Sequence, residues 1–90
     1  MKVIKEYLLD KTNTAPQTLY LPVGAEPVAV QDTSRGLIIQ AISDFIEQST
    51  ALRTFKICAV DENIYADKIR YIDNFESAFG RCHVIEFVNE

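Results

Sequence analysis

Arginine and tyrosine are the residue types in this chain that are best suited to holding a ligand. The four arginines stand beside predicted turns or at the ends of predicted strands. Guanidinium groups that converge bind phosphate or carboxylate oxygens through paired donors, and a tyrosine ring stacks on a base. Surface arginines paired with the thirteen acidic side chains are the alternative explanation. The predicted anion site consists of Arg53 and Arg81, which each begin a strand, together with Arg35 and Tyr71.

The acidic segment of residues 61–67 is the part of the sequence that most resembles a metal-binding loop. Its carboxylate and amide side chains suit a hard cation such as Ca²⁺. It has no glycine at the turn position and no glutamate that closes the loop, so a solvated turn is favoured over a calcium site. A metal site on His83, the one histidine, would need partners that converge on it. We therefore predict no metal and no cofactor.

Thiol and acid–base catalysis are the remaining chemistry to consider. Cys82 is adjacent to His83, but neighbouring residues of a strand point to opposite faces. A catalytic pair of Cys58 and His83 remains as an alternative, although a histidine that only packs across the strand is favoured. Asp73 and Glu86 are candidates for general acid–base work, and nothing in the sequence indicates that they are neighbours. Because no nucleophile–base pair is evident, the chain is not predicted to be an enzyme.

The composition is that of one small acidic domain. A chain of 90 residues with 48% hydrophobic residues can form a single core, so one domain over residues 1–90 is predicted. The net charge of −4, with scattered basic residues, argues against a nucleic-acid binder. Charged residues interrupt the first apolar run before it is long enough for the apolar segment of a signal peptide. No run reaches the roughly 20 apolar residues that span a bilayer. We expect a cytoplasmic protein with both cysteines reduced.

The elements that must position these side chains are short apolar runs separated by turns. Alternating apolar and polar residues, rich in valine, isoleucine and aromatic types, are typical of strands. Connections too brief for crossover helices favour antiparallel pairing. We therefore predict an all-β or β-dominated α+β domain with a sheet or barrel-like architecture of about seven strands. The runs are KVIKEYLL, TLYL, PVAVQ, LIIQAI, RTFKICAV, RYIDNF and CHVIEFV.

The segment of residues 37–48 supports two predictions. Its apolar residues recur at helical spacing, and Ser34 is placed to cap a helix. The β-branched run and the preceding hairpin turn favour instead a strand from Leu37 to about Ile42, followed by an irregular or one-turn connection. One short helix within this segment and a strand are left open as alternatives.

Face assignments along the predicted strands indicate a core and a self-association surface. Apolar edge strands with few prolines can pair or pack across a two-fold axis, so a homodimer is expected. Residues that recur on consistent strand faces should form the interior. The predicted core comprises Val3 or Ile4, Leu21, Val28, Val30, Phe55, Ile57, Ile72, Ile85 and Phe87.

The order of these segments resembles a family of small tailed-phage proteins with no assigned function. The most characteristic piece is the pattern LP-x-GA-x-x-x-x-VQ, which runs from Leu21 to Gln31. An Arg-x-Phe strand, here Arg53 and Phe55, follows it. The chain departs from the family in its middle segment, where DFIEQSTAL replaces an acidic loop that contains proline. The resemblance implies no catalytic residues, because the family supplies none.

Two functions follow as expectations. The first is a non-catalytic binding or adaptor module that engages a host or phage protein in the cytoplasm of an infected bacterium, which fits the small size and the missing catalytic set. The alternative is a protein that binds or sequesters a nucleotide-like anion, with arginines and tyrosines from two subunits forming the pocket.

Overall fold

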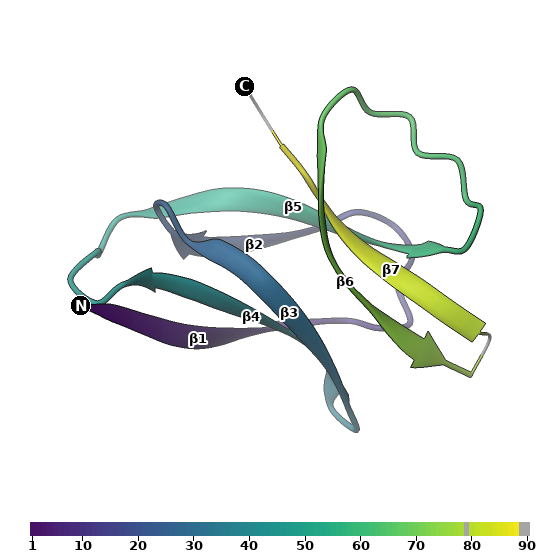
Figure 1. The fold of residues 1–90 in the computed structure, drawn as a ribbon, viewed down its shortest axis with the longest axis horizontal. Coiled ribbons are helices and arrows are strands. Elements are labelled where there is room, and N and C mark those ends of the chain that lie inside the picture. The colour runs from purple at the N-terminus through teal and green to yellow at the C-terminus, as the bar shows by residue number, and fades with distance from the viewer. Residues whose placement is uncertain (79, 89–90) are drawn as a thin grey trace.

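The computed structural model describes residues 1–78 and 80–88, and it contains seven strands (Figure 1). Every strand corresponds to one of the apolar runs predicted from the sequence, and two of the runs extend one residue beyond β5 and β7, to Val60 and Val88. The strands are β1 (Lys2–Leu9), β2 (Gln17–Pro22), β3 (Glu26–Thr33), β4 (Gly36–Asp44), β5 (Thr50–Ala59), β6 (Ile69–Ser77) and β7 (Gly80–Phe87). The described residues contain no helix, and the fold is all-β.

The seven strands form two antiparallel sheets that pack face to face. The first has the order β1-β4-β3, and the second has the order β2-β5-β7-β6. In Figure 1 the first sheet lies in front of β2 and β5 of the second, and the two sheets adjoin where β3 meets β6. The predicted antiparallel architecture is confirmed, as an open two-sheet arrangement and not as a closed barrel.

The segment of residues 37–48 is a strand followed by a loop. Leu37, Ile39, Ala41 and Ser43 are buried on the inner face of β4, and the residues between them are half-buried. This alternation has the two-residue period of a strand. Because β4 is the central strand of its sheet and pairs on both sides, its tertiary partners override the helical spacing. No helix in the described part of the chain is long and apolar enough to cross a membrane.

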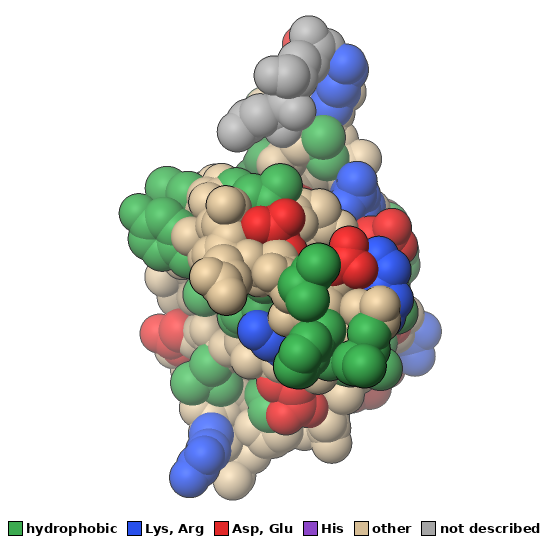
Figure 2. Space-filling model, turned by 90° about the vertical axis from the view of Figure 1, so that its left-hand side faces the viewer, with side chains coloured by type: hydrophobic (Ala, Val, Ile, Leu, Met, Phe, Trp, Pro, Cys, Tyr) green, Lys and Arg blue, Asp and Glu red, His purple; other side chains and the backbone are tan. Residues whose placement is uncertain are grey.

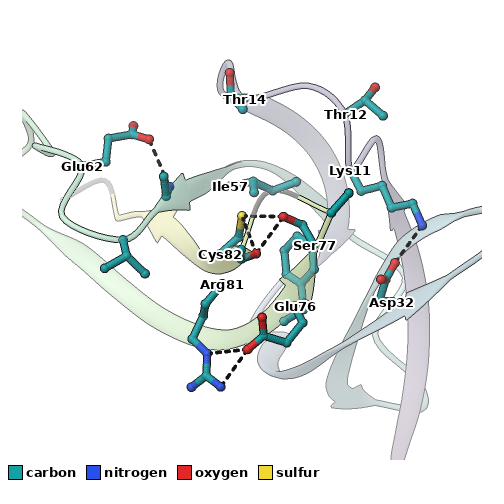
Figure 3. Close-up of a pocket in the computed structure, with 15 residues that line it drawn as sticks. Lys11, Thr12, Thr14, Asp32, Ile57, Glu62, Glu76, Ser77, Arg81 and Cys82 are labelled. Atoms are coloured by element: carbon teal, nitrogen blue, oxygen red, sulfur yellow. Dashed lines mark hydrogen bonds and ion pairs between the residues drawn. The ribbon is translucent and has the colours of Figure 1, made fainter.

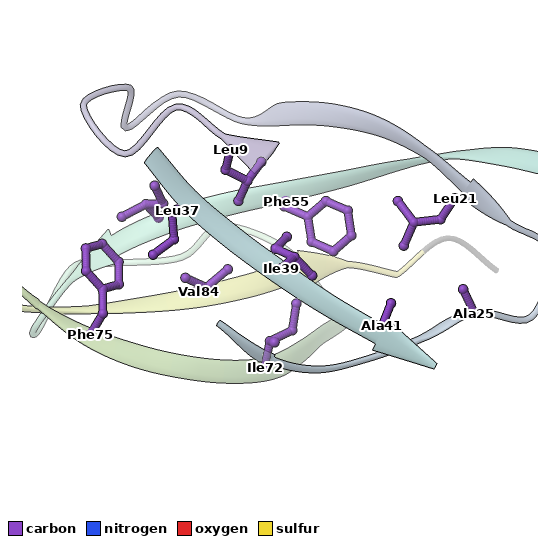
Figure 4. Close-up of a cluster of buried hydrophobic side chains, with 11 residues drawn as sticks. Leu9, Leu21, Ala25, Leu37, Ile39, Ala41, Phe55, Ile72, Phe75 and Val84 are labelled. Carbon is purple, nitrogen blue, oxygen red and sulfur yellow. The ribbon is translucent and has the colours of Figure 1, made fainter. Parts of the chain in front are cut away.

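The hydrophobic core lies between the sheets and draws on both of them (Figure 4). Phe55 is completely buried at its centre. The predicted core members Leu21, Phe55, Ile57, Ile72 and Ile85 are all buried, although Ile85 lies outside the main cluster. That cluster comprises Leu9, Leu21, Ala25, Leu37, Ile39, Ala41, Phe55, Ile57, Ile72, Phe75 and Val84.

The core prediction is wrong for Val28, which is 46% exposed. The register of β3 against β4 shifts between Pro27 and Ala29, which leaves Val28 unpaired at a β-bulge. The bulge turns the Val28 side chain away from the core. Pro27 is buried in its place. Of the two alternatives in β1, Val3 is half-buried whereas Ile4 is exposed.

Val30 and Phe87, also predicted for the core, are half-buried. Val30 packs against the core cluster, and its amide donates a hydrogen bond of 3.0 Å to the Asp73 carboxylate on the other sheet. Asp73 follows a second register shift, between Tyr71 and Asp73 in β6. The two irregular strands are therefore tied together where the sheets adjoin.

The edge strand β1 carries a lysine on its inner face. Lys5 lies opposite the buried Ala41 and is itself exposed. Inward-pointing charges on an edge strand oppose pairing with the edge of another chain. On the outer face of the same strand, Ile4 and Leu8 are exposed, and they lie opposite Ile42 and Ile38 of β4. Self-association is therefore expected through this apolar face and not through the edge of β1. The homodimer stays a prediction.

Candidate functional site

Three chain segments meet at one end of the sandwich, on the left of Figure 1. They are the N-terminal residue, the turn between β2 and β3, and the loop of residues 45–49 between β4 and β5. The Phe45 amide donates a hydrogen bond of 2.9 Å to the Met1 carbonyl, and the Val23 amide donates one of 2.9 Å to the Ser49 carbonyl. These backbone hydrogen bonds hold the three segments side by side.

The side chains at this end are unusually apolar for loop residues. Phe45 is 61% exposed and Ile46 is 81% exposed, and Met1 and Val23 are also exposed. We call Met1, Val23, Phe45 and Ile46 the loop-end patch. Figure 2 views this end and shows hydrophobic side chains in several groups, interspersed with acidic and basic ones. Exposed aromatic and aliphatic residues on adjoining loops are typical of a surface that contacts another protein.

A cleft of about 400 Å³ adjoins the loop-end patch and shares Val23 with it. It is lined by Pro22 to Glu26 of the β2–β3 turn and by Ala51, Arg53 and Arg70. We call it the turn cleft. Gly24 has a φ of +80°, a conformation that a glycine adopts without strain. This glycine allows the turn to bring its backbone over the two arginines.

Arg53 is committed to a structural ion pair at the base of the turn cleft. Its Nε and Nη2 atoms donate to the two oxygens of the Glu86 carboxylate, the latter at 2.8 Å, and its Nη1 donates to the Ala25 carbonyl. The Glu86 side chain is 5% exposed. This bidentate pair links β5 to β7 and the turn to both, so Arg53 has few donors left for a ligand.

Arg70 is the more available cation in the turn cleft. Its Nη1 lies 3.6 Å from Glu86 Oε1, and its side chain is 47% exposed. Glu86 is already satisfied by the shorter contacts with Arg53. The Arg70 guanidinium therefore retains forked donors beside the exposed Val23, where a carboxylate of a partner could accept them.

The structure does not bring the four predicted site residues together within one chain. Arg81 lies in the β6–β7 hairpin and donates from Nε and Nη2 to Glu76, at 3.0 and 2.9 Å. Thr54 pairs with Phe87 and Ala59 with Cys82. Arg53 and Arg81 therefore lie beyond opposite ends of this ladder, roughly 20 Å apart at about 3.3 Å per residue.

The other two predicted residues lie elsewhere. Arg35 is exposed in the turn between β3 and β4. Tyr71 is on the outer face of the second sheet, where its hydroxyl lies 2.8 Å from His83 Nδ1 and accepts a hydrogen bond of 3.3 Å from Asn74. A tyrosine and a histidine joined in this way form a polar cluster on the outer surface of the sheet, whereas the neighbouring Arg70 lines the turn cleft on the other face of β6.

The acid–base and thiol candidates occupy structural positions. Asp73 accepts the hydrogen bond from Val30, and Glu86 is paired with Arg53. Cys58 lies directly across from His83, but it is buried. Burial raises the pKa of the Cys58 thiol above its ordinary value of 9.0, which keeps it protonated and opposes a nucleophilic role.

The acidic segment of residues 61–67 is anchored by one ion pair. Glu62 lies 2.7 Å from Lys56 Nζ, and it accepts a hydrogen bond from the Ala59 amide. The hydrogen bond from Lys56 is the main reason that the pKa of Glu62 lies below its ordinary value of 4.5. In the part of the chain that the structure describes, no three histidine, cysteine or acidic side chains gather in a group that could hold a metal ion.

Sequence reasoning missed Arg70 as the available cation and Phe45 and Ile46 as surface residues. The helical spacing of residues 37–46 placed both apolar residues on the buried face of a helix. A usable signal was Glu86, a charged residue on the same strand face as Val84, because a buried carboxylate needs a cation from a neighbouring strand. The sequence alone does not say which strand that is.

Comparison of the chain with protein-family models, with curated proteins and with solved structures finds no match.

Proposed function

We propose that this protein is a non-catalytic binding module that docks on a partner protein through the loop-end patch. The exposure of Phe45 and Ile46 on a loop held by backbone hydrogen bonds carries the proposal. Large apolar side chains at such a position lose contact with water when a partner covers them, and aromatic residues contribute strongly to binding at the centre of an interface. The loop is presented by a rigid two-sheet scaffold, which limits the entropy lost on binding.

The partner is a protein segment that presents apolar side chains next to a carboxylate. Arg70 and Val23 line the same cleft, so a carboxylate that reaches Arg70 lies beside the apolar loop-end patch. Such a charge contributes orientation and association rate, while the apolar contacts contribute most of the affinity. Following the resemblance to small tailed-phage proteins, the expected partner is a host or phage protein in the cytoplasm of an infected bacterium.

The alternative of a nucleotide-like anion requires a different arrangement. Arg53 and Arg81 are far apart in one chain, and each is already paired with a carboxylate. An anion site built from these two residues would need two subunits and the loss of one or both ion pairs. The loop-end patch needs neither, and it is therefore the function that we favour.

The test is capture from a lysate of phage-infected bacteria, followed by titration of the captured protein with purified variants. Phe45→Ala should weaken binding by roughly 30-fold, the equivalent of about 2 kcal/mol at an interface hot spot. Arg70→Gln should weaken it several-fold and reduce its salt dependence. The matched control is Tyr65→Ala, since Tyr65 is an exposed aromatic residue on the loop between β5 and β6.

The outcomes separate the two functions. Binding lost with Phe45→Ala and Ile46→Ser but retained with Tyr65→Ala supports the proposal. Capture that is insensitive to both loop substitutions, or a wild-type chain that retains no protein, refutes it. Saturable binding of a nucleotide that is lost with Arg81→Gln would favour the anion-binding alternative.

A further inference from the structure

A second cavity, drawn in Figure 3, lies at the opposite end of the sandwich from the loop-end patch. Its volume is about 690 Å³. It opens between the sheets where the loop of residues 10–16, the end of β5 and the β6–β7 hairpin come together. We call it the hairpin cavity. Small-molecule sites typically have volumes of about 300–1,000 Å³, a range that includes the volume of this cavity.

The wall of the hairpin cavity is largely apolar. Ile57 and Phe75 belong to the hydrophobic core and form part of this wall, so the cavity is continuous with the core. Ala59 and Ala78 line it as well, and their short side chains leave space that larger residues would fill. A cavity with such walls favours apolar matter over water.

The charged groups around the hairpin cavity are already paired with one another. Lys11 Nζ lies 2.9 Å from Asp32, and Arg81 Nη2 lies 2.9 Å from Glu76. The third acidic group of the wall, Glu62, is paired with Lys56. Every charged residue that lines the cavity thus has a partner of opposite sign. Two basic and three acidic residues line it, and Lys56, which lies outside the lining, balances the third acidic charge.

A charged ligand would therefore meet no unpaired counter-ion and would lose hydration on entry. An uncharged ligand has no such cost, and the hydroxyl groups of Thr12, Thr14 and Ser77 and the Cys82 thiol offer it a few weak polar contacts. We infer that the hairpin cavity binds an uncharged, mostly apolar small molecule of two or three rings. This inference is independent of the proposed protein-binding function, because it concerns the other end of the molecule.

The first test uses two fluorescent probes that share a ring system but differ in charge. The neutral probe is N-phenyl-1-naphthylamine, and the anionic probe is 8-anilinonaphthalene-1-sulfonate. We expect saturable binding of the neutral probe at one site per chain, at least tenfold tighter than binding of the anion. Ala59→Phe fills the cavity and should weaken binding of the neutral probe at least tenfold. Ala66→Phe is the matched control, since Ala66 is an exposed residue that does not line the cavity.

The second test reports occupancy through a cysteine and needs no cavity-filling variant. Cys82 lines the hairpin cavity, whereas Cys58 is buried. In a Cys58→Ser chain, N-ethylmaleimide should modify Cys82, and saturating neutral probe should slow this reaction at least fivefold. The probe should leave the rate unchanged at a cysteine introduced as Ala66→Cys in the Cys58→Ser, Cys82→Ser background.

Three results would overturn the inference. One is the absence of saturable binding by the neutral probe. Another is unchanged affinity in a folded Ala59→Phe chain together with an unprotected Cys82. The third is tighter binding of the anionic probe that is lost with Arg81→Gln, which would show that Arg81 leaves Glu76 to hold a charged ligand. None of these results depends on Phe45 or Ile46, so a failure here is distinguishable from a failure of the proposed function.

Discussion

Replacement of Arg53 by methionine is the substitution with the largest effect that the structure predicts outside the apolar core. The Arg53 side chain is 16% exposed, and its carboxylate partner Glu86 is more deeply buried. Methionine keeps much of the apolar stem but removes the donors that satisfy both Glu86 oxygens and the Ala25 carbonyl. The buried carboxylate is then left with Arg70 at 3.6 Å.

The expected loss of stability is about 3 kcal/mol. Removing one partner of a buried ion pair typically costs about 3–5 kcal/mol, because the other charge stays buried and uncompensated. We take the low end because Arg70 is half-exposed and can move closer to Glu86. For a domain of this size, about 3 kcal/mol lowers the midpoint of thermal unfolding by on the order of 12–24 °C.

The double substitution of Arg53→Met with Glu86→Met shows how much of the lost stability comes from the unpaired buried charge and how much from altered packing. Both charges are absent from that variant, so its free energy of unfolding should lie closer to wild type than that of either single variant. Arg81→Met is the matched control, because Arg81 forms a similar pair with Glu76 on the surface. A surface pair contributes about 0–1 kcal/mol.

Urea unfolding followed by circular dichroism measures all four variants on one scale. A loss below about 1 kcal/mol for Arg53→Met, equal to that for Arg81→Met, would refute the reasoning. So would a double variant whose loss equals the sum of the two single losses, because the pair would then show no coupling.

Four further predictions follow from single features of the structure. Phe55→Ala should lower the free energy of unfolding by about 3–5 kcal/mol, and an unchanged melting temperature would show that the ring is not buried. Gly36→Ala should lower the free energy of unfolding by about 1–3 kcal/mol, because φ is +146° and a Cβ would lie 2.8 Å from the Leu9 carbonyl oxygen. A urea midpoint equal to that of the wild type would contradict this. The hydrogen bond from Lys56 lowers the pKa of folded Glu62, so this stabilisation is present above the ordinary value of 4.5 and is lost as the pH falls through the lower folded pKa. Glu62→Gln should therefore flatten the pH dependence of stability in that acidic range, and a profile identical to wild type would contradict it. Sedimentation at micromolar concentration should show a homodimer, and a monomer alone would exclude it.

The strand segments were largely determined by the sequence itself. Alternation of apolar and polar residues is a local property, and proline, glycine and asparagine interrupt it at the turns. For this reason all seven strands, their antiparallel pairing and the burial of Leu21, Phe55 and Ile57 could be predicted. Local pattern was insufficient at residues 37–48, where helical and strand periods overlap and pairing with β1 and β3 decides the outcome.

The site was decided by tertiary structure. The register of β5 against β7 sets Arg53 beside Glu86 and far from Arg81, and no spacing along the chain contains that information. A bulge in β3 turns Val28 outward, although the alternation of its neighbours placed it inward. Phe45 and Ile46 are apolar residues. Their side chains are exposed only because the loop after β4 lies at the end of the sandwich, outside both sheets. Residue type thus determines which groups can bind a partner, while the long-range pairing of strands determines which of them meet.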